Sequence, residues 1–320
     1  MHVLVTGGAG FIGSHLVDRL IQDGHFVLVL DNLETGRIEN LKGAEKSDQL
    51  AFVEGSILDS ELVDRLVAKV DFTYHLAAAV GVFNILERPL ASLMTNLRGT
   101  ENVLDAAHKH SCPVLVASSS EVYGKNTSDS LQEDDSRILG SPLTLRWSYS
   151  QAKALDETLA YAYWKEKGLQ ARIVRFFNTV GPRQLGAYGM VVPRFIAAAL
   201  ANEDITIYGD GNQTRCFGHV SDVVEALIQV TNSEKTIGTV VNIGNNEEIS
   251  INDLAAKIIE MTGSKSKIVY VSYDDAYKFG FEDMERRVPN IDRIKELTGW
   301  APIRDLETII LDMVKYFQNN

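Results

Sequence analysis

The residue pair best suited to chemistry is a tyrosine and a lysine four positions apart. Tyr149 and Lys153 lie in a stretch with helical apolar spacing over 148–167, so both side chains share one face of the expected helix. A free tyrosine, with a pKa of ~10, is a poor base at neutral pH. A neighbouring ammonium group stabilises the phenolate and lowers that pKa. The pair could therefore remove a proton from a hydroxyl group, although the same spacing also occurs in ordinary surface helices.

A serine-rich segment follows an expected buried strand over 114–117. Ser118, Ser119 and Ser120 come directly after this strand, so their hydroxyl groups lie at its carboxyl end. Open α/β sheets bind ligands at that end. A simple turn is the alternative interpretation, but the coincidence with the Tyr149–Lys153 pair favours a catalytic role.

A glycine-rich turn, GGAGFIG at 7–13, joins the first expected strand to the first expected helix. Gly7 lets the chain turn, Gly10 lets the backbone approach a pyrophosphate, and Gly13 permits close helix packing. The helix N-terminus adds free N–H groups and a positive dipole end. Asp31 ends the second strand, 18 residues beyond Gly13, where a carboxylate would bind ribose hydroxyls and repel a 2′-phosphate. The turn thus predicts a dinucleotide site that prefers NAD to NADP.

These motifs require a particular order of elements to bring them together. In the first half of the chain, short apolar runs alternate with amphipathic stretches, which indicates a doubly wound parallel sheet. The expected strands there are 2–5, 26–30, 50–53, 72–76, 114–117 and 172–176, and the expected helices are 11–22, 61–68, 91–110 and 148–167. After a loop over 178–188, we expect strands at 205–208 and 240–243 and helices at 193–200, 220–231, 251–261, 291–297 and 306–317.

This order predicts an α/β fold with two parts. A Rossmann domain over 1–177 would bind NAD and would also receive part of 213–245. A smaller C-terminal α/β lobe over 178–320 would bind the substrate. The length of 320 residues supports two parts, because it exceeds what one hydrophobic core usually reaches.

Composition narrows the class of protein further. Hydrophobic residues make up 45% and charged residues 23% of the chain, which is typical of globular proteins. The formal net charge of −12 disfavours nucleic acid and anionic membranes as partners. Two cysteines, no long apolar run and no signal peptide predict a cytoplasmic protein without disulfides. The seven histidines show no metal-ligand spacing, so we expect no metal.

The chain resembles the extended short-chain dehydrogenases/reductases, in particular the NAD-dependent nucleotide-sugar epimerases, dehydratases and decarboxylases. The resemblance covers essentially the whole chain and rests on GGAGFIGSH, DNL at 31–33, HLAAA at 75–79, SSSEVYG, YSQAK, RFFNTVGPRQ at 175–184 and IYGDGNQTRCFGHVSD at 207–222. It implies that Tyr149 is the base, that Lys153 clamps the cofactor and that Ser119 binds the sugar O4. Glu121 matches an active-site glutamate of UDP-glucuronate decarboxylases.

The same resemblance implies NAD as cofactor and a UDP-sugar as substrate. The residues expected to bind NAD are Gly7, Gly10, Phe11, Ile12, Gly13, Asp31, Asn32, Ser56, Ile57, Leu76, Ala77, Ala78, Asn96, Ser118, Lys153 and Phe176. The residues expected to bind the UDP-sugar are Val80, Gly81, Asn178, Val191, Thr206, Tyr208, Gln213, Arg215 and Arg287. Ser56 departs from the family pattern, in which an Asp often contacts the adenine amine.

A homodimer is also implied, because helices 91–110 and 148–167 form a four-helix interface in this family. Apolar residues on more than one side of these helices agree with that expectation; they include Leu104, Leu155, Leu159 and Tyr163. Burial within one chain is the alternative explanation.

The members of the family share oxidation at C4 and differ in the fate of the 4-keto sugar. Dehydratases typically carry Asp-Glu before Val-Tyr-Gly, whereas this chain has Ser120-Glu121 and so lacks the required acid. Arg287, in RRVPNI at 286–291, resembles the arginine of UDP-glucuronate decarboxylases and could pair with a uronate or a diphosphate. A surface charge is the alternative for Arg287.

Two features favour an epimerase over a decarboxylase. The segment RWSYSQAK at 146–153 lacks the acidic, glycine-containing stretch that decarboxylases usually show, and VGV at 80–82 is more typical of epimerases. We therefore predict a UDP-glucuronate or UDP-glucose 4-epimerase, with UDP-glucuronate decarboxylase as the alternative. A non-catalytic NAD-binding protein is disfavoured because the tyrosine, lysine and serine are all present. The choice of sugar depends on the loops at 79–88 and 178–194.

Overall fold

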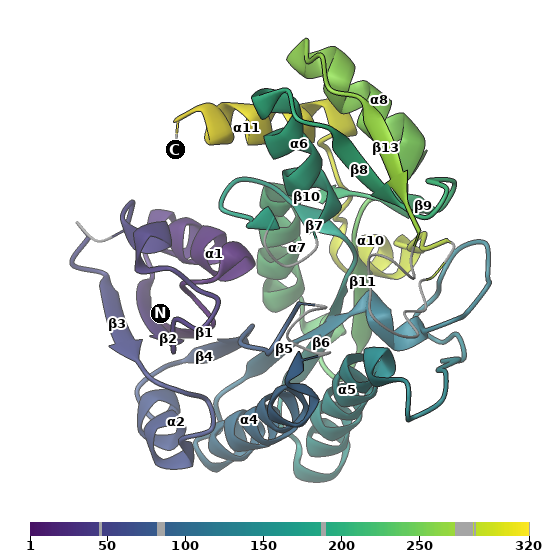
Figure 1. Ribbon diagram of the computed structural model, residues 1–320. Coiled ribbons are helices and arrows are strands. Elements are labelled where there is room, and N and C mark those ends of the chain that lie inside the picture. The colour runs from purple at the N-terminus through teal and green to yellow at the C-terminus, as the bar shows by residue number, and fades with distance from the viewer. Residues whose placement is uncertain (45–46, 82–86, 187–189, 273–283, 285, 320) are drawn as a thin grey trace.

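A seven-stranded sheet forms the centre of the molecule (Figure 1), and all of its neighbouring strands run parallel. The computed structural model describes residues 1–44, 47–81, 87–186, 190–272, 284 and 286–319. The strand order is β11-β6-β5-β4-β1-β2-β3. The strands are β1 (His2–Thr6), β2 (Phe26–Asp31), β3 (Leu50–Glu54), β4 (Phe72–His75), β5 (Val114–Ser119), β6 (Ala171–Phe176) and β11 (Val240–Ile243). The order reverses between β1 and β4, which is where sheets of this kind open a ligand crevice.

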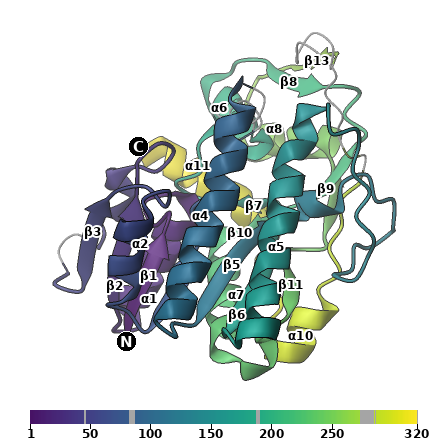
Figure 2. The same ribbon diagram turned by 90° about the horizontal axis from the view of Figure 1, so that it is seen from below.

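Helices cover both faces of this sheet. One face carries α1 (Phe11–Gln22), α7 (Val220–Asn232) and α10 (Asp292–Thr298). The other carries α2 (Ser60–Val67), α4 (Pro89–Lys109) and α5 (Ser148–Lys167), which lie in front in Figure 2. Because successive strand residues point to opposite faces, Val3 and Val5 join the first core and Leu4 joins the second.

The C-terminal part adds a third core above the sheet. It contains α6 (Val191–Ala201), β8 (Ile205–Tyr208), α8 (Ile251–Thr262) and α11 (Leu306–Asn319). Three short strand pairs complete it: β8 with β13 (Ile268–Val271), β9 (Thr214–Cys216) with β12 (Glu248–Ser250), and β7 (Thr179–Val180) with β10 (Gly218–His219). Short 3-10 helices occur at Ile38–Leu41, Ser120–Tyr123, Leu145–Trp147 and Glu234–Thr236.

The predicted fold class is confirmed, and several predicted elements agree with the structure to the residue, including α1, α5, β8 and β11. Two predictions need correction. The loop expected over 178–188 contains β7, a strand too short to show periodicity. Ser118 and Ser119 are the last residues of β5 rather than part of the following turn, because they pair with Arg175 and Phe176 of β6. The division of the chain at 177 stays a prediction.

The surface of α4 and α5 bears on the expected homodimer. Leu104 is fully buried in the core beneath the sheet, so the explanation of burial within one chain holds for this residue. Leu155 is 50% and Tyr161 44% exposed on α5. The homodimer itself stays a prediction.

Two observations concern the expected environment of the protein. Among the described residues, no helix combines the length and the apolar character that crossing a membrane requires. Cys112 and Cys216 are both buried and unbonded to one another.

We expect a Gly13→Ala substitution to destabilise the protein by about 2 kcal/mol, within the usual range for overpacking. A Cβ atom at Gly13 would lie 2.1 Å from the carbonyl oxygen of Gly7, so the turn and α1 would have to separate. Thermal and urea unfolding measure the loss. Gly43→Ala is the control, because its Cβ would meet only Asp18 Oδ1, at 3.6 Å. Equal stability of the two variants would contradict the prediction.

Candidate active site

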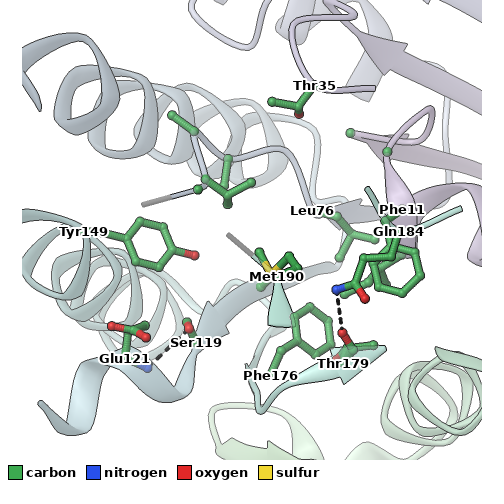
Figure 3. Close-up of a pocket in the computed structure, with 18 of the residues that line it drawn as sticks. Phe11, Thr35, Leu76, Ser119, Glu121, Tyr149, Phe176, Thr179, Gln184 and Met190 are labelled. Atoms are coloured by element: carbon green, nitrogen blue, oxygen red, sulfur yellow. Dashed lines mark hydrogen bonds between the residues drawn. The ribbon is translucent and has the colours of Figure 1, made fainter. Parts of the chain in front are cut away.

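A cavity of about 770 Å³ opens along the carboxyl ends of the parallel strands, and the C-terminal lobe supplies its other walls (Figure 3). All but two of the residues predicted to bind ligands or act in catalysis line this cavity. The exceptions are Asn96 and Thr206. The strand ends therefore bring together motifs that lie far apart in the sequence.

Tyr149 and Ser119 meet at the centre of this cavity. Tyr149 projects from the first turn of α5, and Ser119 ends β5, so the phenol and the hydroxyl face the same space (Figure 3). Burial raises the pKa of Tyr149, while the Lys153 ammonium and a hydrogen bond with Ser119 lower it in part. Ser119 Oγ also accepts a hydrogen bond from Glu121 N at 3.3 Å, which fixes the start of the next turn. This pair can hold and deprotonate a substrate hydroxyl.

Lys153 lies one turn further along α5 and is almost fully buried. Its Nζ donates to the carbonyl oxygen of Ala117 and to Asp156 Oδ2, both at 3.0 Å. Burial by itself would lower the pKa of Lys153, but Asp156 and Tyr149 outweigh it and raise that pKa. The side chain therefore stays cationic beside Tyr149. Sequence reasoning missed Asp156, whose signal was an acidic residue three positions after the lysine on a face that must be buried.

Three charged side chains form a buried cluster, which we call the Arg146–Glu121–Arg287 cluster. Glu121 Oε1 lies 2.8 Å from Arg287 Nη1, and Glu121 Oε2 lies 2.6 Å from Arg146 Nη1. Burial would raise the pKa of Glu121, but the two guanidinium groups lower it to about 2. Glu121 is thus ionised at neutral pH, and the cluster carries a net charge of +1 at the cavity wall.

The cluster is assembled from three segments. Glu121 lies on the 3-10 helix Ser120–Tyr123, and Arg146 on the 3-10 helix Leu145–Trp147 that leads into α5. Arg287 comes from the C-terminal part, where Leu131 N donates to Val288 O at 2.8 Å and holds the segment in place. Sequence reasoning named Glu121 and Arg287 but missed Arg146. Its signal was an arginine three positions before Tyr149.

The glycine-rich turn forms the opposite end of the cavity. Gly7 adopts a φ of +72°, and a Cβ there would come within 2.8 Å of Ala77 N, so the turn lies against the 77–79 loop. Both oxygens of Asp31 accept backbone hydrogen bonds, from Ala9 N and Leu33 N at 2.9 Å. Burial raises the pKa of Asp31, and these two hydrogen bonds oppose the shift. Helix α1 begins at Phe11, with Gly10 as its N-cap in this wall, and no acidic residue or side-chain cap occupies its described first turn.

These groups fit the predicted NAD. The N-terminus of α1 offers backbone N–H groups for a diphosphate, and the carboxylate of Asp31 lies where a ribose would reach. Ser56 and Ile57 line the same end of the cavity. Asn96 does not, because its amide binds the backbone of Ala79 through both Oδ1 and Nδ2, at 2.8 and 3.2 Å. It therefore holds the 77–79 loop from behind.

The far side of the cavity carries the residues predicted to bind the UDP-sugar. Arg215 and Tyr208 line it, and the Arg194 guanidinium lies over the Tyr208 ring at 4.3 Å from the centroid. Asn178 Nδ2 donates to Cys216 O at 2.9 Å, which joins the β6 end to β9. Thr206 lines a different cavity, behind α6. The loops at 79–88 and 178–194 are predicted to select the sugar, and parts of them, residues 82–86 and 187–189, lie outside the described residues.

By sequence, the chain is similar to enzymes whose names refer to nucleotide sugars. The family model described as GDP-mannose 4,6 dehydratase matches residues 4–313. The UDP-N-acetyl-alpha-D-glucosaminuronate decarboxylase of Bacillus cytotoxicus is 42% identical over 98% of this chain and 97% of that protein. UDP-glucuronic acid decarboxylase 1 of Xenopus tropicalis is 38% identical over 99% of this chain and 72% of that protein.

Solved structures share the whole fold. The UDP-glucose 4-epimerase of Thermotoga maritima with UDP-glucose has a TM-score of 0.90 and 32% identity, covering 100% of this chain and 99% of that one. The UDP-glucuronic acid 4-epimerase of Bacillus cereus in complex with UDP-glucuronic acid and NAD has a TM-score of 0.89 and 27% identity, covering 100% of this chain and 99% of that one.

We expect Asp156→Asn to lower the pKa of Tyr149. The negative charge of the Asp156 carboxylate raises the pKa of Tyr149. In the variant, Lys153 still has Tyr149 and Glu157 as neighbours that favour its charged form. Ultraviolet difference titration measures the change, with Tyr149→Phe identifying the signal. Glu166→Gln, an exposed change on the same helix, is the control. An unchanged or raised pKa in Asp156→Asn would show that the charge does not act on Tyr149.

We expect Glu121 to contribute to stability in a defined pH window. Its folded pKa of about 2 lies below the ordinary 4.5, so its contribution is complete above pH 4.5 and is lost as the pH falls toward 2. The free energy of unfolding should therefore fall more steeply over this window in the wild type than in Glu121→Gln. Urea unfolding at a series of pH values tests this, with exposed Glu61→Gln as control. Parallel curves for Glu121→Gln and the wild type would refute the assignment.

Proposed function

Because the chain belongs to the GDP-mannose 4,6-dehydratase family of extended short-chain dehydrogenases/reductases, we propose that it is an NAD-dependent decarboxylase of a UDP-hexuronate. The observation that carries this proposal is the Arg146–Glu121–Arg287 cluster. The two relatives compared above are named as decarboxylases of UDP-uronates. They support the alternative of the sequence analysis better than its main prediction, a 4-epimerase.

The charge of the cluster supports an acidic sugar. Two buried guanidinium groups and one carboxylate leave one positive charge at the cavity wall, and a hexuronate carboxylate would neutralise it. A neutral hexose would bring no opposite charge to the cluster. Glu121 also takes up part of the hydrogen-bonding capacity of both arginines. The substrate carboxylate would therefore be oriented without being bound so strongly that its loss is hindered.

The catalytic groups account for the first step. Tyr149 accepts the proton of the sugar O4, Ser119 positions that hydroxyl, and the Lys153 ammonium favours the phenolate. When bound, NAD supplies the hydride acceptor for C4 and returns the hydride at the end of the reaction. Oxidation makes the C4 ketone β to the C6 carboxylate.

The same groups serve the second step. The C5–C6 bond breaks, CO₂ leaves, and the electron pair passes through C5 to the C4 oxygen as an enolate. Tyr149, now protonated, donates a hydrogen bond to this oxygen, and Ser119 can donate a second. A proton from solvent adds to C5, and reduction at C4 returns the Tyr149 proton to O4. The product is a UDP-pentose.

The proposal is tested by incubating the protein and NAD with UDP-glucuronate or UDP-N-acetylglucosaminuronate. We expect CO₂ release with a UDP-pentose seen by NMR, and no reaction with UDP-glucose. A C4-epimerised uronate formed without CO₂ would reject the decarboxylase and favour the epimerase. The same assay with Tyr149→Phe tests the base, because loss of the phenol should abolish turnover.

We expect Arg287→Gln to reduce kcat/KM for the uronate by roughly a hundredfold, because one partner of a buried charge pair is lost. Arg287→Lys should lose less, since it keeps the charge but not the planar fork. Arg286→Gln is the matched control: Arg286 is the adjacent residue, pairs with Glu248 and does not line the cavity. A similar loss in Arg286→Gln would place the effect in the segment rather than in the cluster.

A further inference from the structure

Gln184 is a buried amide in the cavity wall that neither the proposed mechanism nor the predicted site uses. It is 8% exposed, and its Nε2 donates to the carbonyl oxygen of Thr179 at 2.9 Å. Its Oε1 is buried and accepts no hydrogen bond from the described residues. A buried carbonyl oxygen without a donor is costly and is expected to have a partner. Gln184 lines the cavity, so a ligand there can supply one.

The turn that carries Gln184 is held rigidly against α1. Arg183 has a φ of +69°, an unusual conformation for a residue with a side chain. It forms an ion pair with Asp18 Oδ2 at 2.6 Å, and His15 Nε2 donates to Pro182 O at 2.9 Å. These two contacts fix the turn to the helix that begins at the glycine-rich segment. Backbone strain kept by surrounding contacts is typical of binding sites.

The position of Gln184 relates it to one end of the cavity. Phe176 pairs with Ser119 across β6 and β5, so its side chain lies beside the reacting groups. Thr179 follows three residues later and accepts the Gln184 hydrogen bond. Figure 3 shows Gln184, Phe11, Leu76 and Phe176 around the same pocket, with the dashed bond to Thr179. Apolar and aromatic walls beside one buried acceptor that lacks a described donor suit a flat ring that carries an N–H donor.

We propose that Gln184 Oε1 accepts a hydrogen bond from the carboxamide N–H of the nicotinamide ring and so orients that ring toward Ser119 and Tyr149. The proposal rests on NAD being the cofactor. For hydride transfer, the nicotinamide must lie beside the sugar C4, which Ser119 and Tyr149 place at this end. Adenosine would then lie at the other end, near Asp31. A ribose hydroxyl is a second possible donor, and the test separates the two.

The experiment measures binding to the protein freed of any bound dinucleotide. Calorimetry gives the Kd of NAD and of 3-acetylpyridine adenine dinucleotide, in which a methyl ketone replaces the carboxamide, so that the pyridine ring carries no N–H donor. We expect the wild type to prefer NAD by about five- to tenfold more than Gln184→Met does, the size of one hydrogen bond. Methionine keeps the size of glutamine but offers no comparable acceptor. Gln170→Met, an exposed change, is the control.

Two results would overturn the assignment. An equal loss of affinity for both dinucleotides in Gln184→Met would indicate a hydroxyl donor or a purely structural role for the turn. An unchanged preference would show that Gln184 does not contact the carboxamide. If Gln184→Met unfolds, Gln184→Leu serves instead, because it also removes the acceptor and must show the same loss of preference. Failure of the wild type to bind NAD at all would overturn the proposed function, and this inference with it.

Discussion

Compensation of buried charge around helix α5 is the constraint on which the rest of the site depends. Arg175 of β6 holds Glu157 through two hydrogen bonds of 2.8 and 2.7 Å, and Ser118 donates to Glu157 at 2.6 Å. Lys153 and Asp156 form a second buried pair one turn earlier. Such pairs are held in place because loss of either partner would leave an isolated charge in a dry environment. Together they fix the rotation of α5 against β5 and β6, and with it the direction in which Tyr149 points.

The same constraint gives a different result at the start of α5. There the Arg146–Glu121–Arg287 cluster contains one more cation than anion, and it borders the cavity instead of the core. A charge that is compensated in the core preserves the fold, whereas an excess charge at a cavity wall selects an anionic ligand. The chain as a whole carries a net charge of −12, so this positive site has the opposite sign to the overall charge of the protein.

The two ends of the cavity bind by different means. The glycine-rich turn and α1 offer backbone N–H groups and a helix dipole, which need no side-chain charge. The opposite end relies on side chains from several segments, including Arg215, Tyr208 and Arg287. Asn96 acts behind these walls, since it holds the 77–79 loop in position, and Arg183 ties the 181–184 turn to α1 through Asp18. The backbone thus provides the general dinucleotide site, and side chains provide the choice of sugar.

Much of the fold and part of the site could be predicted from the sequence, because both depend on local patterns. Periodicity gave α1, α5, β8 and β11 their observed bounds, since each element is long enough or apolar enough to show its repeat. Motif spacing brought out Tyr149, Lys153, Ser119 and the glycine-rich turn. Short strands such as β7 were missed because two residues show no period. The preference for an epimerase came from the segment 146–153 and from VGV at 80–82, and neither motif shows which charges surround Glu121 in the folded chain.

What the sequence determined by itself was the class of fold, the dinucleotide motif and the base with its lysine. The tertiary structure alone decided which polar groups meet: Arg146 with Glu121, Asp156 with Lys153, and the Gln184 amide with the Thr179 carbonyl. Arg146 and Asp156 could be placed on or next to the catalytic helix from their positions in the sequence, but their ionic partners could not be predicted. The physical reason is that pairing of buried polar groups depends on the distance between side chains and on the exclusion of water. Both are fixed only when the sheet, α5 and the C-terminal segment have packed together.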